Sequence, residues 1–428
     1  MKYRILLVGD NFLIPTGYGN QLKELAKYFL EKKHEVVLLD TSYPVDRFGK
    51  GFYKVEQFCE EFFSKAHDLD LPFLDYRDEL KGAVITFKRS NEAFPFKDIR
   101  EVFTESQSDI FIVLKDINNY PRDFYLNAPS IVWCPLDTFP LSPSILQNLD
   151  KFSDIVGISN YGKQQFIDYG YSNAKFISHS LNTDLLLKIN KLSKNECRKQ
   201  FNLPEDKFIV SMIASNSESN DRKGWSFNIE GFKKFNEKYS NSLIFFNTNI
   251  KGLRNLKDIE NQLLGLDLKQ YLDFINLKNY KVIPSSMFRK YTQEAMYKMI
   301  RASDVILSCS RGEGCGLLSL ESQALGVPVI STDFTAMTEN NYHKDLLVKP
   351  YCLEWKQSNS FHAIPNIEEI CNKLELVYLN QSKYRDNENI KKIILKNTDY
   401  RLNGDKWIKL IDNTISNFKQ KKVKLVHY

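Results

Sequence analysis

The sequence contains no pair of cysteines spaced as C-x-x-C, and its seven cysteines are odd in number. Both facts argue against a disulfide framework and against a cysteine-rich zinc site. A reducing cytosol is therefore the simplest location. Long apolar runs are also missing, so no transmembrane segment is expected. The first run, Ile5–Val8, stops at Gly9-Asp10 without a small-residue cleavage site, and it predicts a buried strand rather than a signal peptide.

Charge of one sign is not strongly in excess either, because 59 Lys and Arg face 53 Asp and Glu, a formal charge of +6. Much of this excess lies in lysine-rich helices and in a tail with Lys419, Lys421, Lys422 and Lys424, which predicts a solvated surface. Peripheral contact with an anionic membrane surface, such as the inner membrane face, or with nucleic acid is the alternative. With 43% hydrophobic and 26% charged residues, the composition is that of a globular protein.

Buried-strand patterns alternate with helical patterns along the chain, which predicts an α/β fold. Strands are expected at Ile5–Val8, Val36–Leu39, Ala83–Phe87, Ile110–Leu114, Ile131–Cys134, Ile155–Ile158, Phe208–Ile213, Leu243–Phe246, Asp304–Ser308 and Val327–Ser331. Helices are expected at Leu22–Leu30, Lys163–Asp168, Ile229–Lys238, Gln293–Ala302 and Leu317–Leu325.

A length of 428 residues predicts two domains, and the polar stretch Asn190–Asn202 is the best candidate for a linker. We expect two Rossmann-like, doubly wound domains, residues 1–190 and 191–400, that face each other across a central cleft. Residues 401–428 would form a C-terminal helix and basic tail that could pack back on the first domain.

The loop from Gly9 to Asn20 joins the first strand to the first helix and contains Gly17, Tyr18 and Gly19. These glycines could begin a dinucleotide fingerprint, with Asp40 near the place of a ribose-binding acid. Leu22 replaces the third glycine, however, and the glycines lie too far from the strand. A loop that lets the backbone approach a ligand, or a purely structural turn, remains open as an interpretation.

The most informative stretch is Ser310 to Glu321, between the strand patterns Asp304–Ser308 and Val327–Ser331. It places Glu313 on a glycine-rich loop and Glu321 in the helix that follows. Such a loop lies at the carboxyl end of a parallel strand, where free N–H groups at the helix start favour anions. Two carboxylates cannot both serve a phosphate, so their partners are expected to be sugar or ribose hydroxyls.

Two further loops could complete this site. Arg222 and Lys223 follow the strand Phe208–Ile213 and precede a helix, so they could hold a diphosphate. Asp137 ends the strand Ile131–Cys134 between Pro135 and Pro140; it could cap a turn or bind an acceptor hydroxyl.

The residues Glu313-Gly314-Cys315-Gly316-Leu317-Leu318 and Glu321 resemble the E-x7-E signature of glycosyltransferase family 4. The resemblance extends to Ala302-Ser303-Asp304-Val305, to Ala324-x-Gly326-Val327-Pro328 and to Arg222-Lys223-Gly224. It implies the GT-B fold and a retaining hexosyltransferase that uses a nucleotide-sugar, UDP- or GDP-sugar above all, as co-substrate and needs no other cofactor.

The resemblance also implies roles for single residues. Glu313 would bind the transferred sugar, Glu321 the ribose, and Arg222 and Lys223 the donor diphosphate. The remaining donor-binding residues would be Gly17, Tyr18, Gly19, Asn216, Gly314, Cys315, Gly316, Leu317 and Leu318. Many family members have an arginine where this chain has Ser215 and Asn216. Many also have a histidine near the reacting centre, in a loop whose counterpart here contains Asp137, so the catalytic role of Asp137 is a hypothesis.

Physical chemistry agrees with this interpretation, because cations stabilise the charge that develops on a leaving diphosphate. No convincing nucleophile–base pair is found, so the departing phosphate would take the acceptor's proton. A metal is not required for this chemistry, and the D-x-D-like Asp68-Leu69-Asp70 follows no strand. A sugar-nucleotide epimerase, a phosphorylase-like enzyme or a non-catalytic scaffold of the same fold stays open. A glycan, a lipid-linked sugar, a protein and a modified nucleic acid are all compatible with the sequence as acceptors.

Overall fold

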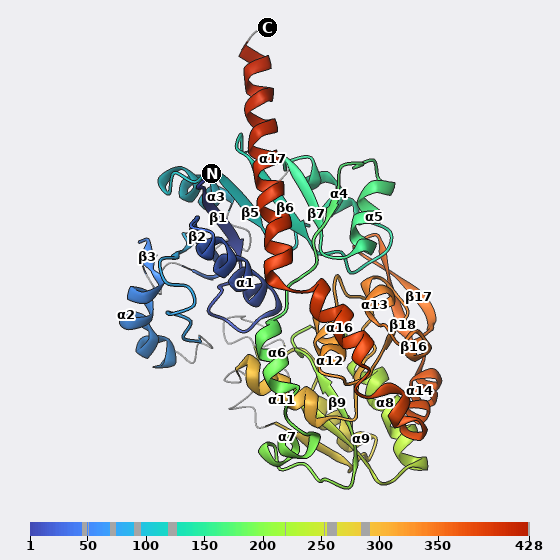
Figure 1. The fold of residues 1–428 in the computed structure, drawn as a ribbon. Coiled ribbons are helices and arrows are strands. Elements are labelled where there is room, and N and C mark those ends of the chain that lie inside the picture. Colours follow the sequence, from blue (N-terminus) through green and yellow to red (C-terminus); the bar gives the residue numbers. More distant parts are fainter. Residues whose placement is uncertain are drawn as a thin grey trace. The chain divides into compact units, whose positions relative to one another are not determined.

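The computed structural model describes residues 1–44, 49, 51–68, 74–89, 96–118, 126–218, 220–251, 253–254, 263–283 and 292–426. The chain forms two compact α/β units (Figure 1). The first unit consists of Met1–Leu136, Pro140–Asn182 and Asn397–Tyr428, and the second of Asp137–Phe139 and Thr183–Lys396. The chain therefore changes unit at Asn182 and not within the expected linker Asn190–Asn202. Two residues of the D-x-D-like stretch, Leu69 and Asp70, lie outside the described residues.

The first unit is built on an eight-stranded sheet with the order β3-β4-β2-β1-β5-β6-β7-β8. Its strands are β1 (Arg4–Gly9), β2 (Glu35–Pro44), β3 (Tyr53–Lys54), β4 (Val84–Lys88), β5 (Ile110–Val113), β6 (Ser130–Cys134), β7 (Asp154–Gly157) and β8 (Lys175–Phe176). Its helices are α1 (Gly17–Glu31), α2 (Val55–Asp68), α3 (Phe96–Glu105), α4 (Pro143–Leu149), α5 (Asn160–Asp168) and α17 (Tyr400–Val426). All pairs are parallel except β3 with β4.

The side chains of β1 and β5 suit their central position in the sheet. Strands β1 and β5 are apolar along their buried length, as expected for parallel strands covered on both faces. They pair directly, with Ile5 opposite Ile110 and Val8 opposite Val113. The six strands predicted in this half of the sequence are confirmed, and so are both helices.

The last helix, α17, belongs to the first unit. Trp407 packs edge-on against Trp133 of β6, with ring centroids 5.0 Å apart. The hydroxyl of Thr414 donates to Asp154 at 2.6 Å, and that of Tyr3 donates to Asp412 at 2.5 Å. The chain thus returns to its first unit after completing the second.

The second unit contains a six-stranded parallel sheet with the order β13-β10-β9-β14-β15-β16. Its strands are β9 (Phe208–Ile213), β10 (Ser242–Asn247), β13 (Tyr280–Val282), β14 (Val305–Ser308), β15 (Val329–Thr332) and β16 (Leu347–Val348). Its helices are α6 (Thr183–Ile189), α7 (Lys194–Gln200), α8 (Trp225–Lys238), α9 (Leu268–Phe274), α11 (Gln293–Ala302), α12 (Leu317–Ala324), α13 (Ala336–Asn340), α14 (Ile367–Leu379), α15 (Gln381–Tyr384) and α16 (Glu388–Asn397). The predicted strands and helices of this half are confirmed.

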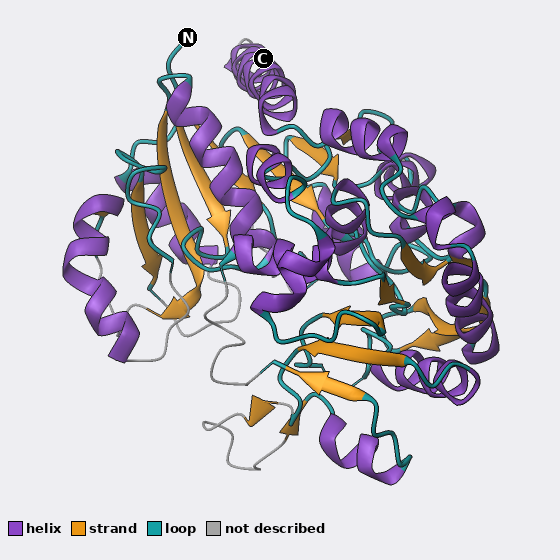
Figure 2. Cartoon of the chain, turned by 60° about the horizontal axis from the view of Figure 1, so that its bottom comes forward, coloured by secondary structure: helices purple, strands orange, loops and turns teal. Residues whose placement is uncertain are grey.

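In each unit the strands form a layer with helices packed against it (Figure 2). The core of the second unit places Trp225, Ile229 and Phe232 of α8 against the sheet residues Val210 and Phe246. Both units are therefore Rossmann-like, as predicted. None of the helices in the described part of the chain is both long and apolar enough to cross a membrane.

Two short antiparallel ribbons complete the second unit: β11 (Leu253–Arg254) with β12 (Leu263–Leu264), and β17 (Pro350–Lys356) with β18 (Ser360–Pro365). Strand β18 also pairs with the segment Asp137–Phe139, through an antiparallel bridge between Phe139 and Phe361. The backbone N–H of Phe361 donates to the carbonyl of Phe139 at 2.5 Å. This bridge holds Asp137 in the second unit, although its sequence neighbours belong to the first.

Candidate functional site

The glycine-rich loop lies between β14 and α12 in the second unit. Gly316 precedes the first turn of α12 with φ 71° and ψ 54°, a left-handed conformation that glycine adopts without strain. No side chain caps this helix, and its first turn contains no acidic residue. Leu317 and Leu318 are only partly buried. The start of α12 can therefore offer backbone N–H groups to an anion.

The start of the neighbouring helix α8 is occupied. Asp221 accepts hydrogen bonds from the backbone N–H of Trp225 at 2.7 Å and of Ser226 at 3.1 Å. The hydroxyl of Ser226 also donates to Asp221, at 2.6 Å. Of these two adjacent loop–helix junctions, that of α8 has N–H groups bound by a carboxylate of the chain itself, whereas that of α12 has no side-chain cap.

Glu313 is fixed at both its side chain and its backbone. Its Oε1 lies 2.6 Å from Nζ of Lys223, and its Oε2 lies 3.5 Å from Nη1 of Arg222. The hydroxyl oxygen of Thr335 accepts from the backbone N–H of Glu313 at 3.2 Å and donates to its carbonyl at 3.0 Å. Thr335 has φ 53° and ψ −141°, an unfavourable conformation for a β-branched residue. Such strain is typical of functional sites.

Arg222 has three carboxylates around its guanidinium group. Its Nε and Nη2 donate to the two oxygens of Glu218, at 2.9 and 2.7 Å. Its Nη1 donates to the carbonyl of Gly312 at 3.2 Å, and the same atom lies 3.6 Å from Oδ2 of Asp137. The structure therefore brings together the four residues Asp137, Arg222, Lys223 and Glu313 that the sequence suggested as catalytic.

The charges of this cluster reinforce one another. Burial alone would raise the pKa of Glu313, but Lys223 and Arg222 outweigh it and hold the pKa at about 2. Burial opposes the charge of Arg222, yet Glu313, Glu218 and Asp137 raise its pKa above the usual range. Glu313 and Arg222 are thus ionised at every pH at which proteins normally work.

Asp137 reaches the cluster because Gly312 has no side chain. A Cβ atom at Gly312 would lie 1.9 Å from the carbonyl oxygen of Asp137, which is far inside van der Waals contact. The side chain of Asp137 is 39% exposed, so it can meet a ligand. Gly312 is required for close packing of two backbones and not for a left-handed conformation.

Arg311 connects the cluster to the hairpin β17–β18. Its Nη1 donates to the carbonyl of Asn220 at 2.8 Å and its Nε to that of Ala363 at 3.2 Å, while Nη2 pairs with Glu354. His362, opposite Glu354 in the hairpin, is buried, and its Nδ1 finds no hydrogen-bond partner in the part of the chain that is described. Burial lowers the pKa of His362, which favours the neutral imidazole.

Glu321 lies in α12, one helix turn and a fraction beyond Leu317, and is only 6% exposed. Burial raises its pKa to about 8, and a hydrogen bond from Tyr297 of α11 opposes this rise. The two glutamates of the predicted signature thus differ strongly, because Glu313 has cationic partners and Glu321 has a neutral one.

Two other predicted donor-binding residues are engaged in the protein itself. Nδ2 of Asn216 donates to the carbonyls of Asn249 and Leu266, and its Oδ1 accepts from the N–H of Leu266 at 2.8 Å. Asn216 therefore holds the loop after β9, and its contact with a donor stays a prediction. Cys315 is buried, and its carbonyl accepts from Asn340 at 2.7 Å, so it would offer backbone and not its thiol.

Gly17, Tyr18 and Gly19 lie in the first unit, at the start of α1. Gly17 is exposed, but a Cβ atom on Gly19 would lie 2.5 Å from the carbonyl oxygen of Ile14. Gly19 thus serves packing within its own loop. The carboxylate of Asp40 is fully buried and accepts from Asn11 at 2.9 Å, which leaves it unavailable to a ribose. These contacts argue further against a dinucleotide fingerprint.

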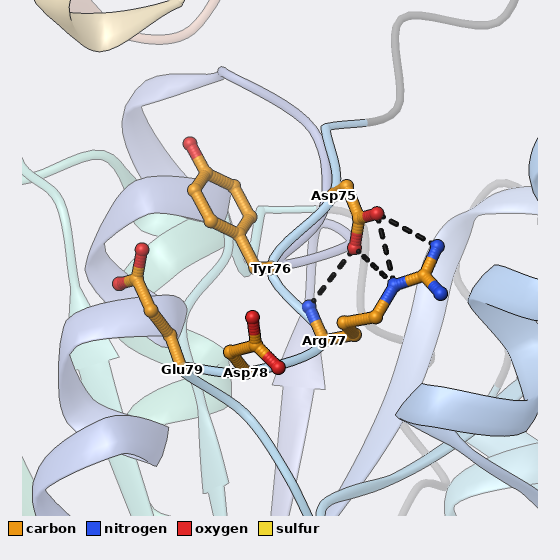
Figure 3. Close-up of a pocket in the computed structure, with 5 residues that line it drawn as sticks. All are labelled: Asp75, Tyr76, Arg77, Asp78 and Glu79. Atoms are coloured by element: carbon orange, nitrogen blue, oxygen red, sulfur yellow. Dashed lines mark hydrogen bonds and ion pairs between the residues drawn. The ribbon is translucent and has the colours of Figure 1, made fainter.

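A separate hollow of about 310 Å³ lies in the first unit and is lined by the consecutive residues Asp75 to Glu79 (Figure 3). Arg77 turns back onto Asp75, with Nη2 2.8 Å from Oδ2. On the other side, the ammonium of Lys23 lies 4.2 Å from the ring centre of Tyr76. In this hollow Asp75 and Arg77 are paired with each other, and none of the predicted site residues lines it.

Several residues of the site were not found from the sequence. Glu218, Arg311, Thr335 and Tyr297 each interact with a predicted site residue, and Glu354 pairs with Arg311. A signal existed for two of them: Arg311 is part of the Ser310–Glu321 stretch, and Glu218 precedes Arg222 by four residues. The other three come from segments whose sequence gives no indication of their partner.

The chain is similar to a protein family and to a curated protein. Residues 241–355 match the family model described as Glycosyl transferases group 1. An uncharacterized glycosyltransferase of Methanocaldococcus jannaschii is 26% identical over 185 residues, which are 43% of this chain and 40% of that relative. The alignment thus spans about two fifths of the relative's length.

Solved structures resemble nearly the whole chain. A glycosyltransferase from Rickettsia africae superposes with a TM-score of 0.65 and 16% identity over 97% of this chain and 99% of its own. Sucrose-phosphate synthase from Thermosynechococcus elongatus gives a TM-score of 0.68 and 12% identity over 97% of this chain and 100% of its own. Anabaena HepE, solved with UDP and glucose, superposes with a TM-score of 0.61 and 13% identity over 96% of this chain and 100% of its own.

At these identities the likeness shows the fold, which is GT-B as predicted. The family match covers Glu313, the glycine-rich loop and Glu321, but neither Arg222 nor Lys223. The chain therefore has the GT-B fold, and its residues 241–355 are similar to the glycosyl transferases group 1 family.

Proposed function

We propose that the protein is a retaining glycosyltransferase that moves a hexose from a UDP- or GDP-sugar to an acceptor hydroxyl without a metal ion. The observation that carries this proposal is the position of the Glu313 carboxylate. It lies 2.6 Å from Lys223 and 3.5 Å from Arg222, on the loop before the uncapped start of α12. Cations and free N–H groups suit a diphosphate, and an ionised carboxylate beside them suits sugar hydroxyls.

Each residue then has a task in the transfer. Cleavage of the sugar–phosphate bond builds negative charge on the diphosphate, and Arg222, Lys223 and the backbone around Gly316, Leu317 and Leu318 would stabilise it. Glu313 would accept hydrogen bonds from the transferred sugar. Glu321 would accept them from the ribose, and Asp137 from the acceptor hydroxyl. No metal is needed in this scheme, because side-chain cations neutralise the phosphates.

The charge state of Glu313 supports the retaining route. A carboxylate with a pKa of about 2 is a weak base, and its oxygens are directed to Lys223 and Arg222. The proton of the acceptor would therefore pass to the departing phosphate, while the acceptor oxygen attacks the face that the phosphate leaves. One C–O bond breaks and one forms on the same face, so the anomeric configuration is kept.

The proposed donor is based on a solved structure of the same fold. The proposed cytoplasmic location is based on the state of the cysteines. Anabaena HepE, which shares the fold, has been solved with UDP-glucose. All seven cysteines are free thiols, six of them buried, which fits a cytoplasmic protein. Contact with the inner membrane face stays a prediction, since the side chains of the basic tail beyond Gln420 lie outside the described residues.

A thermal-shift screen over UDP-, GDP- and ADP-sugars tests the proposal, because a ligand that binds only the folded state raises its stability. A UDP- or GDP-sugar should raise the melting temperature, and the same sugar should appear on an acceptor, or be released to water, in the presence of EDTA. No shift and no turnover with any nucleotide-sugar would refute the proposal. Interconversion of the donor without transfer would indicate an epimerase.

A further inference from the structure

Arg311 precedes Glu313 by two residues and joins their common loop to two other segments of the second unit. Its backbone N–H donates to the carbonyl of Arg222 at 2.8 Å, and its Nη1 donates to the carbonyl of Asn220, also at 2.8 Å. Its Nε donates to the carbonyl of Ala363 at 3.2 Å, and its own carbonyl accepts from the N–H of Ala363 at 2.8 Å. Arg311 is only 5% exposed, so it acts through these neighbours.

The two carbonyls that Arg311 binds in the loop after β9 flank a strained residue. Asp221 lies between Asn220 and Arg222 and has φ 50°, in the left-handed region. Aspartate enters this region more readily than most residues but still at an energetic cost, so surrounding contacts must hold it there. Arg311 supplies one such contact on each side. The turn at Asp221 sets the direction in which the chain continues into Arg222 and Lys223.

We propose that Arg311 is the positioning residue of this loop: by holding the carbonyls on both sides of Asp221, it keeps Arg222 and Lys223 directed to the donor diphosphate. This inference rests on the proposed function, because it assumes that these two cations bind a diphosphate. A guanidinium group suits the task, since its donors point in fixed directions and can reach two segments at once. Lysine, with one mobile ammonium group, cannot reproduce that fork.

The same residue holds the hairpin β17–β18 against the loop. Both backbone groups of Ala363, in β18, are bound to Arg311. Phe361 of the same strand donates its N–H to the carbonyl of Phe139, and this bridge holds Asp137 in the second unit. Arg311 therefore joins the loop of the two proposed phosphate-binding cations to the strand that holds Asp137.

A positive charge near a phosphate site also attracts anions without positioning any other group. The charge of Arg311 is paired with Glu354, whose carboxylate contacts Nη2. Substitution by lysine keeps the charge and loses the fork, whereas substitution by methionine loses both. Positioning therefore predicts that Arg311→Lys resembles Arg311→Met. An effect of charge alone predicts that Arg311→Lys resembles the wild type.

The first test is calorimetric titration of pyrophosphate into the wild type, Arg311→Lys and Arg311→Met. We expect the Kd to rise about tenfold in Arg311→Met and at least about fivefold in Arg311→Lys, because Arg222 and Lys223 lose their fixed direction. Wild-type affinity in Arg311→Lys would overturn the inference.

Hydrogen exchange supplies a second test that needs no ligand. The carboxylate of Asp221 accepts from the backbone N–H groups of Trp225 and Ser226, at the start of α8. If Arg311 holds the turn at Asp221, these two N–H groups should exchange about tenfold faster in both Arg311 variants than in the wild type. Unchanged exchange in both variants would show that the turn holds without Arg311.

Arg301→Met is the matched control. Arg301 of α11 is 9% exposed, donates to the carbonyls of Leu192 at 3.2 Å and Leu325 at 3.0 Å, and pairs with Asp386. It thus has the same kinds of partner as Arg311, outside the loop after β9. Its substitution should lower stability and leave both the pyrophosphate Kd and the exchange at the start of α8 unchanged.

The outcomes separate this inference from the proposed function. Equal losses of pyrophosphate affinity in Arg301→Met and Arg311→Met would mean that Arg311 has only a general structural role, and the inference would be wrong. If the wild type binds neither pyrophosphate nor UDP, while Trp225 and Ser226 exchange faster only in the Arg311 variants, Arg311 positions the loop as inferred and the proposed function fails.

Discussion

Arg222 and Glu218 form a bidentate ion pair, in which Nε and Nη2 of the guanidinium donate to the two carboxylate oxygens at 2.9 and 2.7 Å. This planar fork is the geometry in which arginine binds phosphate as well as carboxylate. The arginine proposed to hold the donor diphosphate is therefore already paired. A phosphate that binds through this fork has to displace Glu218.

Removing this competitor should strengthen binding of the diphosphate. We expect Glu218→Gln to lower the Kd for UDP and for pyrophosphate by roughly threefold, since a half-exposed ion pair is worth about 1 kcal/mol or less. Calorimetric titration of both ligands measures the change. Glu237→Gln makes the same change of charge at an exposed position of α8 and should leave both Kd values unaltered. Weaker binding in Glu218→Gln would show that Glu218 supports the site.

Glu313 should matter for transfer and not for nucleotide affinity. Glu313→Gln removes the carboxylate that would bind the transferred sugar, and it also frees Lys223 and Arg222 for phosphate. We therefore expect transfer or donor hydrolysis to fall by about 100-fold or more, with UDP bound as well as or better than by the wild type. Rates with a UDP-sugar and titrations with UDP check the two parts. A clear loss of UDP affinity would contradict the separation of sugar and diphosphate sites.

Glu321 should make the second unit less stable at high pH. Its pKa is about 8 in the folded protein and 4.5 when unperturbed, so the folded state binds the proton more tightly. The stabilisation that comes from this tighter proton binding is fully present below about pH 4.5 and is lost as the pH rises through about 8. In the absence of ligand, the melting temperature of Glu321→Gln should therefore gain on that of the wild type between about pH 6 and 9. A constant difference across this range would mean that Glu321 titrates normally.

Substitution of Gly312 by any residue with a side chain should destabilise the protein. In Gly312→Ala the new Cβ would meet the Asp137 carbonyl at 1.9 Å, so the segment Asp137–Phe139 must move away from the loop. We expect a loss of roughly 1–3 kcal/mol of stability, together with reduced transfer. Chemical denaturation and the transfer assay measure both. Asp137→Asn keeps the backbone contact, so it should reduce transfer without reducing stability. Equal stability of Gly312→Ala and the wild type would show that the loop adapts to the new side chain.

Much of the fold could be predicted because many of its strands stand out in the sequence as short, largely apolar runs. Phe208–Ile213 and Asp304–Ser308 are apolar runs, as parallel strands buried on both faces require. The hairpin β17–β18 was not predicted, since Tyr351, Leu353 and Trp355 are exposed and β17 shows no alternation of burial. The expected linker contains α7, whose capping box of Ser193 and Glu196 is a helix signal in the sequence itself.

The sequence predicts which loops form the site, but not every contact between their side chains. The loops of Glu313 and Lys223 follow strands β14 and β9, which are neighbours in one sheet, so their meeting follows from the topology. The four-residue spacing of Glu218 and Arg222 is a signal for their ion pair but does not predict it, because both residues lie in a loop and the spacing does not show how that loop turns. Nor does spacing reveal that Tyr297 of α11 opposes the rise in the pKa of Glu321 in α12. These contacts depend on packing at the level of single side chains.

The bridge between Phe139 and Phe361 has a consequence for dividing the chain. Polypeptide passes from one unit to the other four times: after Leu136, Phe139, Asn182 and Lys396. A protein cut once, near residue 182, would yield a second half without the segment Asp137–Phe139 that bridges to β18, and a first half without α17. The two halves are therefore better studied by separating their functions with point mutations than by expressing them as fragments.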